Sequence, residues 1–168
     1  MQPPNAFDLD AAYEQHGNGL YRFCLRLSGS PQDAEDLVQD TFLAAVAGHD
    51  RFESRSSEAT WLFRIARHKV YKLLRRRKLE RLFSPQSGAT PVRADGIAIA
   101  QCVDQLPLPM REAFLLVKVE GFTSAEAGAI LRAPEGTVRF RVHQAIKQLR
   151  TFWDDADEPV KEGVPHAV

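Results

Sequence analysis

The sequence predicts an all-α fold made of two small helical domains joined by a flexible linker. Its 168 residues suit one domain or two small ones, at roughly 100–200 residues per domain. No strand-like alternation of useful length is present, whereas helix-start signals recur along the chain. Residues 84–96 contain two Pro, two Gly and no apolar periodicity, which is typical of a linker. We therefore expect domains over residues 1–83 and 97–152, followed by an acidic, disordered tail over 153–168.

Capping residues and apolar spacing place each helix. Ser30 and Pro31, followed by Asp33, offer an N-cap, a first-turn proline and an acid near the helix start. Thr123 and Glu126 have the spacing of a capping box. The expected helices span residues 7–27, 31–47, 58–79, 97–105, 109–120, 124–131 and 135–152.

The charge is segregated along the chain, although it sums to zero. With 22 Lys and Arg against 22 Asp and Glu, a nucleic-acid partner has to be reached through local charge and not through overall basicity. Residues 64–81 carry nine bases against Glu80 alone, which is an anion-binding footprint. Residues 132–150 carry five bases against one acid, whereas residues 28–50 carry five acids and no base.

The expected helix over 31–47 separates acids from apolar residues. Ala34, Val38 and Phe42 share one face of a helical repeat. The acids of the opposite face are Asp33, Asp36 and Asp40. Acidic helical faces are most often simply solvated, and the residues alone favour that interpretation.

The expected helix over 58–79 mixes bases with aromatic rings on one face. Its apolar stripe is formed by Leu62, Ala66, Val70 and Leu73. The opposite face collects Trp61, Arg64, His68, Tyr71, Lys72 and Arg75. Lys and Arg neutralise phosphates, and exposed rings stack on unpaired bases, so this face indicates a nucleic-acid contact. The alternative is that Trp61 and Tyr71 pack against the first helix while the charges are only solvated.

The second half has the pattern of a helix-turn-helix, with the helix from residue 135 as the candidate reader. The side chains expected to point outward, with their flanking neighbours, are Thr137, Arg139, Phe140, Arg141, His143, Gln144 and Lys147. In a major groove Arg can bond guanine and Gln can bond adenine. A protein-binding helical hairpin is the alternative.

No chemistry-bearing motif points to an enzyme. The five His are scattered, and Cys24 and Cys102 have no neighbouring ligand or nucleophile partner. We expect no catalytic residue, no metal site, no disulfide and no cofactor. The N-terminus lacks a basic region followed by an apolar core, and no apolar run is long enough to span a bilayer, so we expect a cytoplasmic protein without membrane insertion.

Motifs in both halves resemble bacterial RNA polymerase sigma factors. The segments of the first half that resemble region 2 of these factors are Leu20-Tyr-Arg-Phe23, Asp33-Ala-Glu-Asp-Leu-Val-Gln-Asp-Thr-Phe42, Phe52, Trp61-Leu-Phe-Arg-Ile-Ala-Arg67 and Arg75-Arg-Arg-Lys78. The segments of the second half that resemble region 4 are Leu106-Pro107, Arg111-Glu-Ala-Phe-Leu-Leu116, Glu120-Gly-Phe-Thr123, Gly136-Thr-Val-Arg139 and Leu149-Arg150. Both sets occur in the family's order without regions 1 and 3, which is typical of the extracytoplasmic-function (ECF) type of the sigma-70 family.

The resemblance implies a subunit that joins core RNA polymerase and directs promoter recognition and transcription initiation, without catalysis of its own. It also implies control by an anti-sigma factor. In the family the acidic helix contacts the clamp helices of the largest polymerase subunit. The residues that match this contact are Asp33, Asp36, Gln39 and Asp40. This implication replaces the solvated-face interpretation of the acidic helix.

The resemblance also implies two promoter contacts. The non-template strand of the minus-ten element would meet Phe52, Ser54, Arg55, Trp61, Arg64, His68, Tyr71, Lys72, Arg75 and Arg76. The minus-thirty-five element would be read as duplex by Thr137, Arg139, Phe140, Arg141, His143, Gln144 and Lys147. Two rival functions stay open: a sigma-like decoy that sequesters an anti-sigma factor, and a helix-turn-helix repressor that uses only the second half.

Several residues of the second half depart from the family pattern, among them Gly128 and Arg132. Gly128 lies inside an expected helix, where Gly costs roughly 0.5–1 kcal/mol relative to Ala. Arg132 occupies a turn position that favours Gly, so we expect a left-handed conformation there. Both features predict that region 4 is only marginally stable alone.

Overall fold

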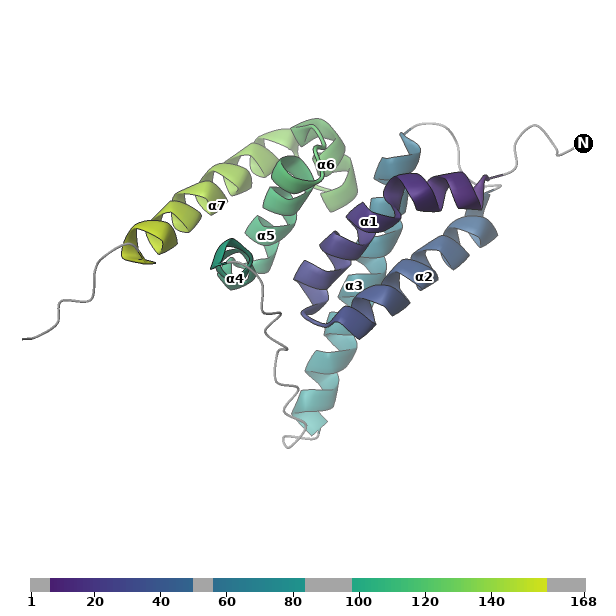
Figure 1. Cartoon of the computed structure of the whole chain (residues 1–168), viewed down its shortest axis with the longest axis horizontal. Helices are drawn as coiled ribbons and strands as arrows, with labels where there is room; N and C mark the ends of the chain where they lie inside the picture. Colours follow the sequence, from purple (N-terminus) through teal and green to yellow (C-terminus); the bar gives the residue numbers. More distant parts are fainter. Residues whose placement is uncertain (1–6, 50–55, 84–97, 157–168) are drawn as a thin grey trace, which may run out of the picture.

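The protein is helical throughout the part that the structure describes (Figure 1). The structure is a computed structural model that describes residues 7–49, 56–83 and 98–156. Its elements are α1 (Leu9–Ser28), α2 (Pro31–Gly48), α3 (Glu58–Phe83), α4 (Ala98–Gln105), α5 (Leu108–Phe114), a π-helical segment η2 (Leu115–Val119), α6 (Ser124–Leu131) and α7 (Glu135–Ala156). The predicted all-α fold is confirmed, and the described ranges contain no strand. Below, the N-terminal half is α1 to α3 and the C-terminal half is α4 to α7.

The predicted caps form as the sequence indicates. The Ser30 hydroxyl accepts the backbone N–H of Asp33 at the start of α2, over 3.3 Å. At the start of α6 the Thr123 hydroxyl accepts the N–H of Glu126, and the Glu126 carboxylate accepts the N–H of Thr123, which completes the capping box. These bonds satisfy backbone donors that have no partner inside the helix.

Two helices differ from the expected ranges. The helix expected over 109–120 is regular only to Phe114 and then widens into η2, where the N–H of Glu120 bonds the carbonyl of Leu115 over 2.9 Å. A π-segment of this kind inserts a residue and changes the direction of the side chains that follow. In addition, α7 continues to Ala156, four residues into the predicted disordered tail, because no helix-breaking residue precedes Pro159.

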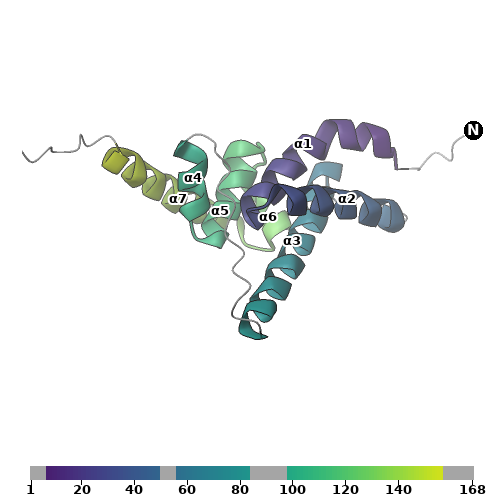
Figure 2. The same ribbon diagram turned by 60° about the horizontal axis from the view of Figure 1, so that its bottom comes forward.

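The N-terminal half is a three-helix bundle with a core of mostly apolar side chains. Ala34, Val38 and Phe42 of α2 are buried as predicted. On α3 the predicted stripe is buried at Leu62, Ala66 and Val70, whereas Leu73 is only half-buried at the edge of the core. In Figure 1 α2 lies on the far side of α1 from the C-terminal half, and the C-terminal end of α3 projects beyond the other helices, as Figure 2 also shows.

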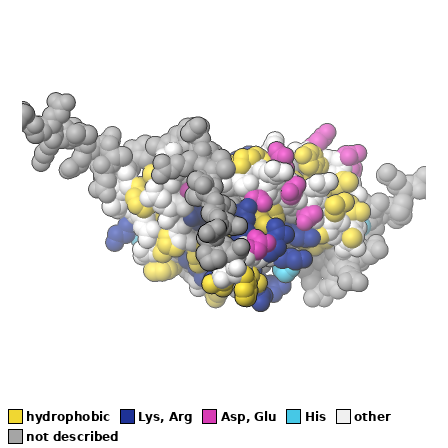
Figure 3. Space-filling view, turned by 90° about the horizontal axis from the view of Figure 1, so that it is seen from below, with side chains coloured by type: hydrophobic (Ala, Val, Ile, Leu, Met, Phe, Trp, Pro, Cys, Tyr) yellow, Lys and Arg dark blue, Asp and Glu magenta, His cyan; other side chains and the backbone are white. Residues whose placement is uncertain are grey.

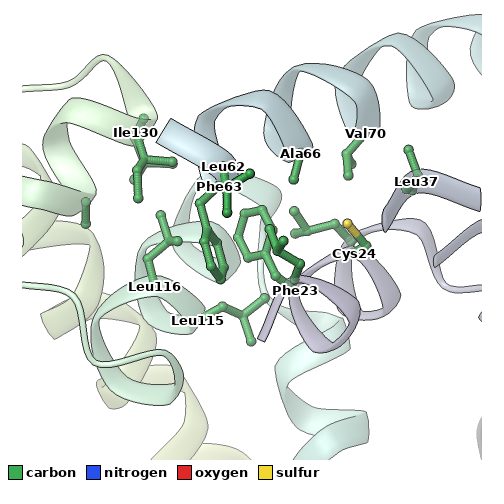
Figure 4. Close-up of a cluster of buried hydrophobic side chains, with 14 of the residues drawn as sticks. Phe23, Cys24, Leu37, Leu62, Phe63, Ala66, Val70, Leu115, Leu116 and Ile130 are labelled. Atoms are coloured by element: carbon green, nitrogen blue, oxygen red, sulfur yellow. The ribbon is translucent and has the colours of Figure 1, made fainter. Parts of the chain in front are cut away.

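The two halves share one continuous core. Phe63 of α3 and Phe23 of α1 pack together, with ring centroids 5.5 Å apart, and Leu115 and Leu116 approach them from the C-terminal half (Figure 4). Phe122, which follows η2, meets Phe63 edge to face at 4.9 Å. The described helices therefore form one closed body in which α1 and α3 contact the C-terminal half.

The turn after α6 explains a residue that the sequence suggested was destabilising. A Cβ atom on Gly128 would lie 2.7 Å from the backbone oxygen of Ala133, which is too close for any side chain. Gly128 is therefore favoured by this turn, in addition to the helix-propensity cost expected from the sequence. Arg132 ends α6 with φ 52° and ψ 46°, and the predicted left-handed conformation is confirmed.

Candidate nucleic-acid interface

The basic face of α3 is partly open to solvent and partly used inside the protein. His68, Lys72, Arg75 and Arg76 are exposed, as the nucleic-acid interpretation requires. Arg64 is half-buried, and its guanidinium lies 3.5 Å from the hydroxyl of Ser56. The exposed members are spaced so that they form one cationic strip along α3.

Tyr71 does not point freely to solvent. Its hydroxyl donates a hydrogen bond of 2.8 Å to the carboxylate of Glu112 on α5, and the Nε of Arg67 donates to the same carboxylate over 2.8 Å. The Arg67 guanidinium also lies 4.5 Å from the centre of the Tyr71 ring. Burial, followed by the charge of Glu112, raises the pKa of Tyr71, so the phenol stays protonated and able to donate. Neither of the two interpretations offered from the sequence anticipated this contact.

The aromatic start of α3 is packed against the N-terminal segment. The ring of Trp61 is half-buried and meets Phe7 edge to face, with centroids 5.9 Å apart and planes at 83°. The predicted minus-ten residues Phe52, Ser54 and Arg55 lie outside the described residues.

The acidic face of α2 lies beside the basic side of α3. Together they line a groove of about 530 Å³ whose walls carry Asp36 and Asp40 on one side and Lys69, Lys72 and Arg76 on the other. Figure 3 shows acidic side chains next to a group of Lys and Arg on this face of the molecule. The acidic and basic side chains are thus close enough to weaken each other's electrostatic potential.

Asp33 differs from the other two acids. Its carboxylate is bonded to the guanidinium of Arg77, which also donates to the carbonyl of Ser28 over 3.0 Å. Only about a quarter of either side chain is exposed, at 26% for Arg77 and 22% for Asp33. Asp36 and Asp40 are exposed, so the expected solvent-facing acidic set is reduced by one member.

An apolar groove continues the acidic face on the α1 side of α2. It measures about 1040 Å³, and Gln39 lines both this groove and the mixed-charge groove. Its wall carries two large apolar side chains of α2 that are more than half exposed, Leu43 at 61% and Val46 at 51%. The sequence analysis did not single out these two residues, although exposed apolar residues beside a charged face are a sign of an interaction surface.

The reader helix α7 presents its cations to solvent. Val138, Val142 and Ala145 hold it against the C-terminal half. The exposed members of the predicted set are Arg139, Phe140, His143 and Lys147, whereas Thr137, Arg141 and Gln144 are half-buried. Phe140 is 61% exposed, which confirms that it is not a core residue. The outward-facing set is therefore narrower than the sequence suggested.

The sequence analysis missed Arg67 and Glu112. Glu112 is only 1% exposed although it is charged. A signal was available, since Glu112 lies four residues after Leu108 and four before Leu116, on the apolar repeat of its helix. A charge at such a position needs a buried partner, but the sequence does not say which residue provides it.

The described residues contain no group of His, Cys, Asp and Glu placed to hold a metal ion. Cys24 is fully buried, and burial raises the pKa of its thiol to about 12. None of the described helices is both long and apolar enough to cross a lipid bilayer.

A helical bundle with a cationic helix, closed against a helix-turn-helix unit with an exposed reader helix, defines a DNA-binding protein of two modules. Family models match both modules: Sigma-70 region 2 over residues 12–80 and Sigma-70, region 4 over residues 97–149. The chain belongs to the sigma-70 family, as an RNA polymerase sigma factor of the ECF type. The resemblance inferred from the motifs is confirmed.

Known relatives and structures support this assignment. The chain is 32% identical to the ECF RNA polymerase sigma factor SigE of Mycolicibacterium smegmatis, over 85% of this chain and 60% of that protein. It is 34% identical to the ECF RNA polymerase sigma factor EcfG of Rhodopseudomonas palustris, over 77% of this chain and 76% of that protein. The solved structure of the sigma factor RpoE of Bartonella quintana, in complex with the anti-sigma factor NepR, matches with a TM-score of 0.77 and 30% identity, over 90% of this chain and 99% of that one.

Proposed function

We propose that this protein acts in the cytoplasm as a non-catalytic initiation factor, which binds core RNA polymerase and directs it to promoters. The observation that carries the proposal is that three separate surfaces of one body present the required chemistry. These surfaces are the acidic and apolar face of α2, the cationic strip of α3 and the reader helix α7. Membership of the ECF family supports the same activity.

The polymerase contact is assigned to α2. Asp36 and Asp40 are exposed and supply charge, and Gln39 between them can donate and accept hydrogen bonds. Leu43 and Val46 extend the surface with apolar area that a partner helix can cover. Asp33 belongs to the same predicted set, with its carboxylate held by Arg77 in this structure.

Minus-ten binding is assigned to α3 and the segment before it. Lys72, Arg75 and Arg76 are available to neutralise phosphates of a single strand, and the exposed ring of His68 can hydrogen-bond to the strand. The predicted partners in the same contact are Phe52, Ser54, Arg55, Trp61, Arg64 and Tyr71. Aromatic rings in this set supply stacking for unpaired bases, at about 1–3 kcal/mol for each base.

Minus-thirty-five binding is assigned to α7. Its cations and Phe140 face outward from a helix that the C-terminal half holds rigidly, as major-groove recognition needs. Arg139 is the strongest candidate for a guanine contact, and its guanidinium is paired with the exposed Glu135 at 2.9 Å. The other proposed contacts are Thr137, Phe140, Arg141, His143, Gln144 and Lys147.

Regulation by an anti-sigma factor is part of the proposal. The similar RpoE structure was solved in complex with the anti-sigma factor NepR. The apolar groove between α1 and α2, with Asp10, Glu14 and Glu35 on its walls, offers a surface that a basic amphipathic helix of such a protein can cover.

Run-off transcription with core RNA polymerase on a pool of genomic promoters tests the initiation function. Wild type should produce specific start sites, and changing Arg75 and Arg76 together to Ala should remove them, because two phosphate contacts are lost. A protein that binds polymerase but yields no start site would contradict the proposal and favour the sigma-like decoy.

A pull-down of core polymerase tests the α2 assignment. The double variant Asp36→Asn, Asp40→Asn should lose polymerase binding while its affinity for duplex DNA is unchanged, because both acids are exposed on α2 and far from α7. Glu135→Gln is the matched control, since it removes an exposed acid from α7. Polymerase retention equal to that of the control would refute the assignment.

A further inference from the structure

The contact between the two halves includes a buried carboxylate. Glu112 of α5 is 1% exposed, and its two oxygens accept one hydrogen bond each, from the Nε of Arg67 and the hydroxyl of Tyr71, both over 2.8 Å. Both donors lie on α3, in the other half of the protein. A buried carboxylate needs such partners, because an unpaired charge in a dry interface is strongly unfavourable.

Further polar contacts join the two halves beside the one made by Glu112. Arg22 of α1 donates twice to Glu120, over 3.1 and 2.8 Å, and the Glu120 side chain is only 6% exposed. Arg26 of α1 donates to Asp104 over 3.1 Å, and Arg111 donates to the backbone carbonyl of Arg26 over 3.1 Å. The charges are complementary, since the C-terminal half supplies the acids of these ion pairs and the N-terminal half supplies the bases.

The π-segment η2 positions the side chains at the other end of the contact between the two halves. It lies between Glu112 and the pair Glu120 and Phe122, so a regular helix in its place would turn these two side chains to a different direction. With η2 present, Glu120 reaches Arg22 and Phe122 reaches Phe63. Figure 4 shows apolar side chains of both halves meeting in the same region.

We infer that Glu112 is an intramolecular latch: it holds the C-terminal half on α3, and single-stranded DNA phosphate competes with it for Arg67 and Tyr71. The inference rests on the proposed function, in which α3 binds the non-template strand. It adds a regulatory contact and one new DNA-binding residue, Arg67.

The competition follows from the chemistry of the donors. The Arg67 Nε–H and the Tyr71 O–H point at one anionic oxygen pair, and phosphate presents the same geometry of acceptors as a carboxylate. With Glu112 in place, neither group is available to a DNA backbone. Once Glu112 leaves, both donors lie beside the exposed residues His68, Lys72 and Arg75 and continue the cationic strip.

Small-angle X-ray scattering on the full chain tests the latch. We compare wild type with Glu112→Gln, which keeps the shape but removes the charge, and with Glu162→Gln, a control that removes one acid near the end of the sequence. The fraction of open molecules should rise roughly tenfold in Glu112→Gln, the size expected from the loss of one charge-assisted hydrogen bond. The radius of gyration should rise accordingly, and the control should keep the wild-type value.

Tyr71→Phe supplies a second variant that keeps the ring and removes only the hydrogen bond to Glu112. It should open the protein by less than Glu112→Gln, because Arg67 still holds the carboxylate. Circular dichroism establishes that each variant is folded. If both folded variants scatter as wild type does, the latch is refuted.

Binding of a mixed-sequence 20-nucleotide single strand, followed by fluorescence anisotropy, tests the competition. Glu112→Gln should bind this probe several-fold more tightly than Glu162→Gln does, and Arg67→Gln placed on the Glu112→Gln background should remove the gain. Equal affinity of Glu112→Gln and Glu162→Gln would refute the competition. If no form of the protein bound the strand, the proposed function of α3 would fail, whereas the scattering result would still decide the latch.

Discussion

The two basic helices of this protein use their cations differently. On α3, Arg67 and Arg77 are committed to acids of the protein itself, Glu112 and Asp33. On α7, the ion pair that the structure gives within the described residues is the exposed one between Arg139 and Glu135, and Lys147 faces solvent. A block of bases in the sequence therefore has two uses. Some bases of α3 pair with acids inside the protein, whereas the bases of α7 mainly face solvent.

The difference shows what a charge count can and cannot say. Nine bases between residues 64 and 81 predict an anion partner, and some of these anions turn out to be carboxylates of the same chain. A base whose partner is an internal acid contributes to stability, whereas an exposed base contributes to binding. Variants that separate the two classes sharpen the comparison.

Arg77→Ala is expected to give the largest change in stability. It removes the partner of Asp33 and the bond to the Ser28 carbonyl, so the free energy of unfolding should fall by about 2–3 kcal/mol. Arg75→Ala is the matched control on the same helix, and because Arg75 is exposed its effect should stay within about 0.5 kcal/mol. Urea unfolding followed by circular dichroism measures both. Equal destabilisation by the two variants would show that Arg77 is no more structural than Arg75.

Gly128→Ala tests the C-terminal half, where we expect a substitution at a tightly packed position, and not the loss of an ion pair, to reduce stability most. The new Cβ would meet the Ala133 carbonyl oxygen at 2.7 Å, and relief of this overlap should cost about 1–3 kcal/mol. Gly136→Ala is the matched control, since nothing lies within 4 Å of its Cβ position and the change should be neutral or stabilising by up to about 1 kcal/mol. Thermal unfolding distinguishes the two, and a Gly128→Ala protein as stable as wild type would mean that the turn can relax.

Local signals made most of the fold predictable. The caps at Ser30 and Thr123 act over three residues, and the apolar repeats of α2 and α3 act within one helix, so a single sequence contains all of their information. The close approach at Gly128 could not be predicted, because it depends on the path of the backbone five residues later, at Ala133.

The functional surfaces were predictable in part. Exposure of Asp36, Lys72 and Phe140 follows from helical periodicity alone. The engagement of Tyr71 by Glu112 does not, because the two residues are 41 positions apart and meet only when the halves pack. The widening of α5 into η2 also has no sequence rule behind it, yet it directs Glu120 and Phe122 toward the N-terminal half.

Thr123→Ala is expected to have a smaller effect, of about 1 kcal/mol, through the loss of the capping hydroxyl of α6. The hydrogen bonds from the Thr123 backbone and side chain hold the pKa of Glu126 below its ordinary value of 4.5. A lowered folded pKa stabilises the protein above 4.5, and this part is lost as the pH falls through the folded value. The difference between wild type and variant should therefore stay constant well above pH 4.5 and shrink as the pH falls below 4.5. A difference that did not depend on pH would place the whole effect in the neutral cap bond.

The last comparison concerns the chemical reactivity of the two cysteines, and no change in stability is expected. Each half contains one cysteine: Cys24 is fully buried in the N-terminal bundle, and Cys102 is half-buried in α4. Since burial raises the pKa of Cys24 to about 12, only roughly one molecule in ten thousand carries a thiolate there at about pH 8.

Iodoacetamide, followed by peptide mass spectrometry, should modify Cys102 in the native protein and Cys24 only after denaturation. The reason is that Cys24 is completely buried in the folded protein, whereas part of Cys102 is accessible. The Glu112→Gln variant refines the comparison, because opening the latch separates the halves without unfolding the bundle. Cys24 should stay protected in that variant, and its modification at the rate of Cys102 would show that the N-terminal bundle depends on the C-terminal half for its integrity.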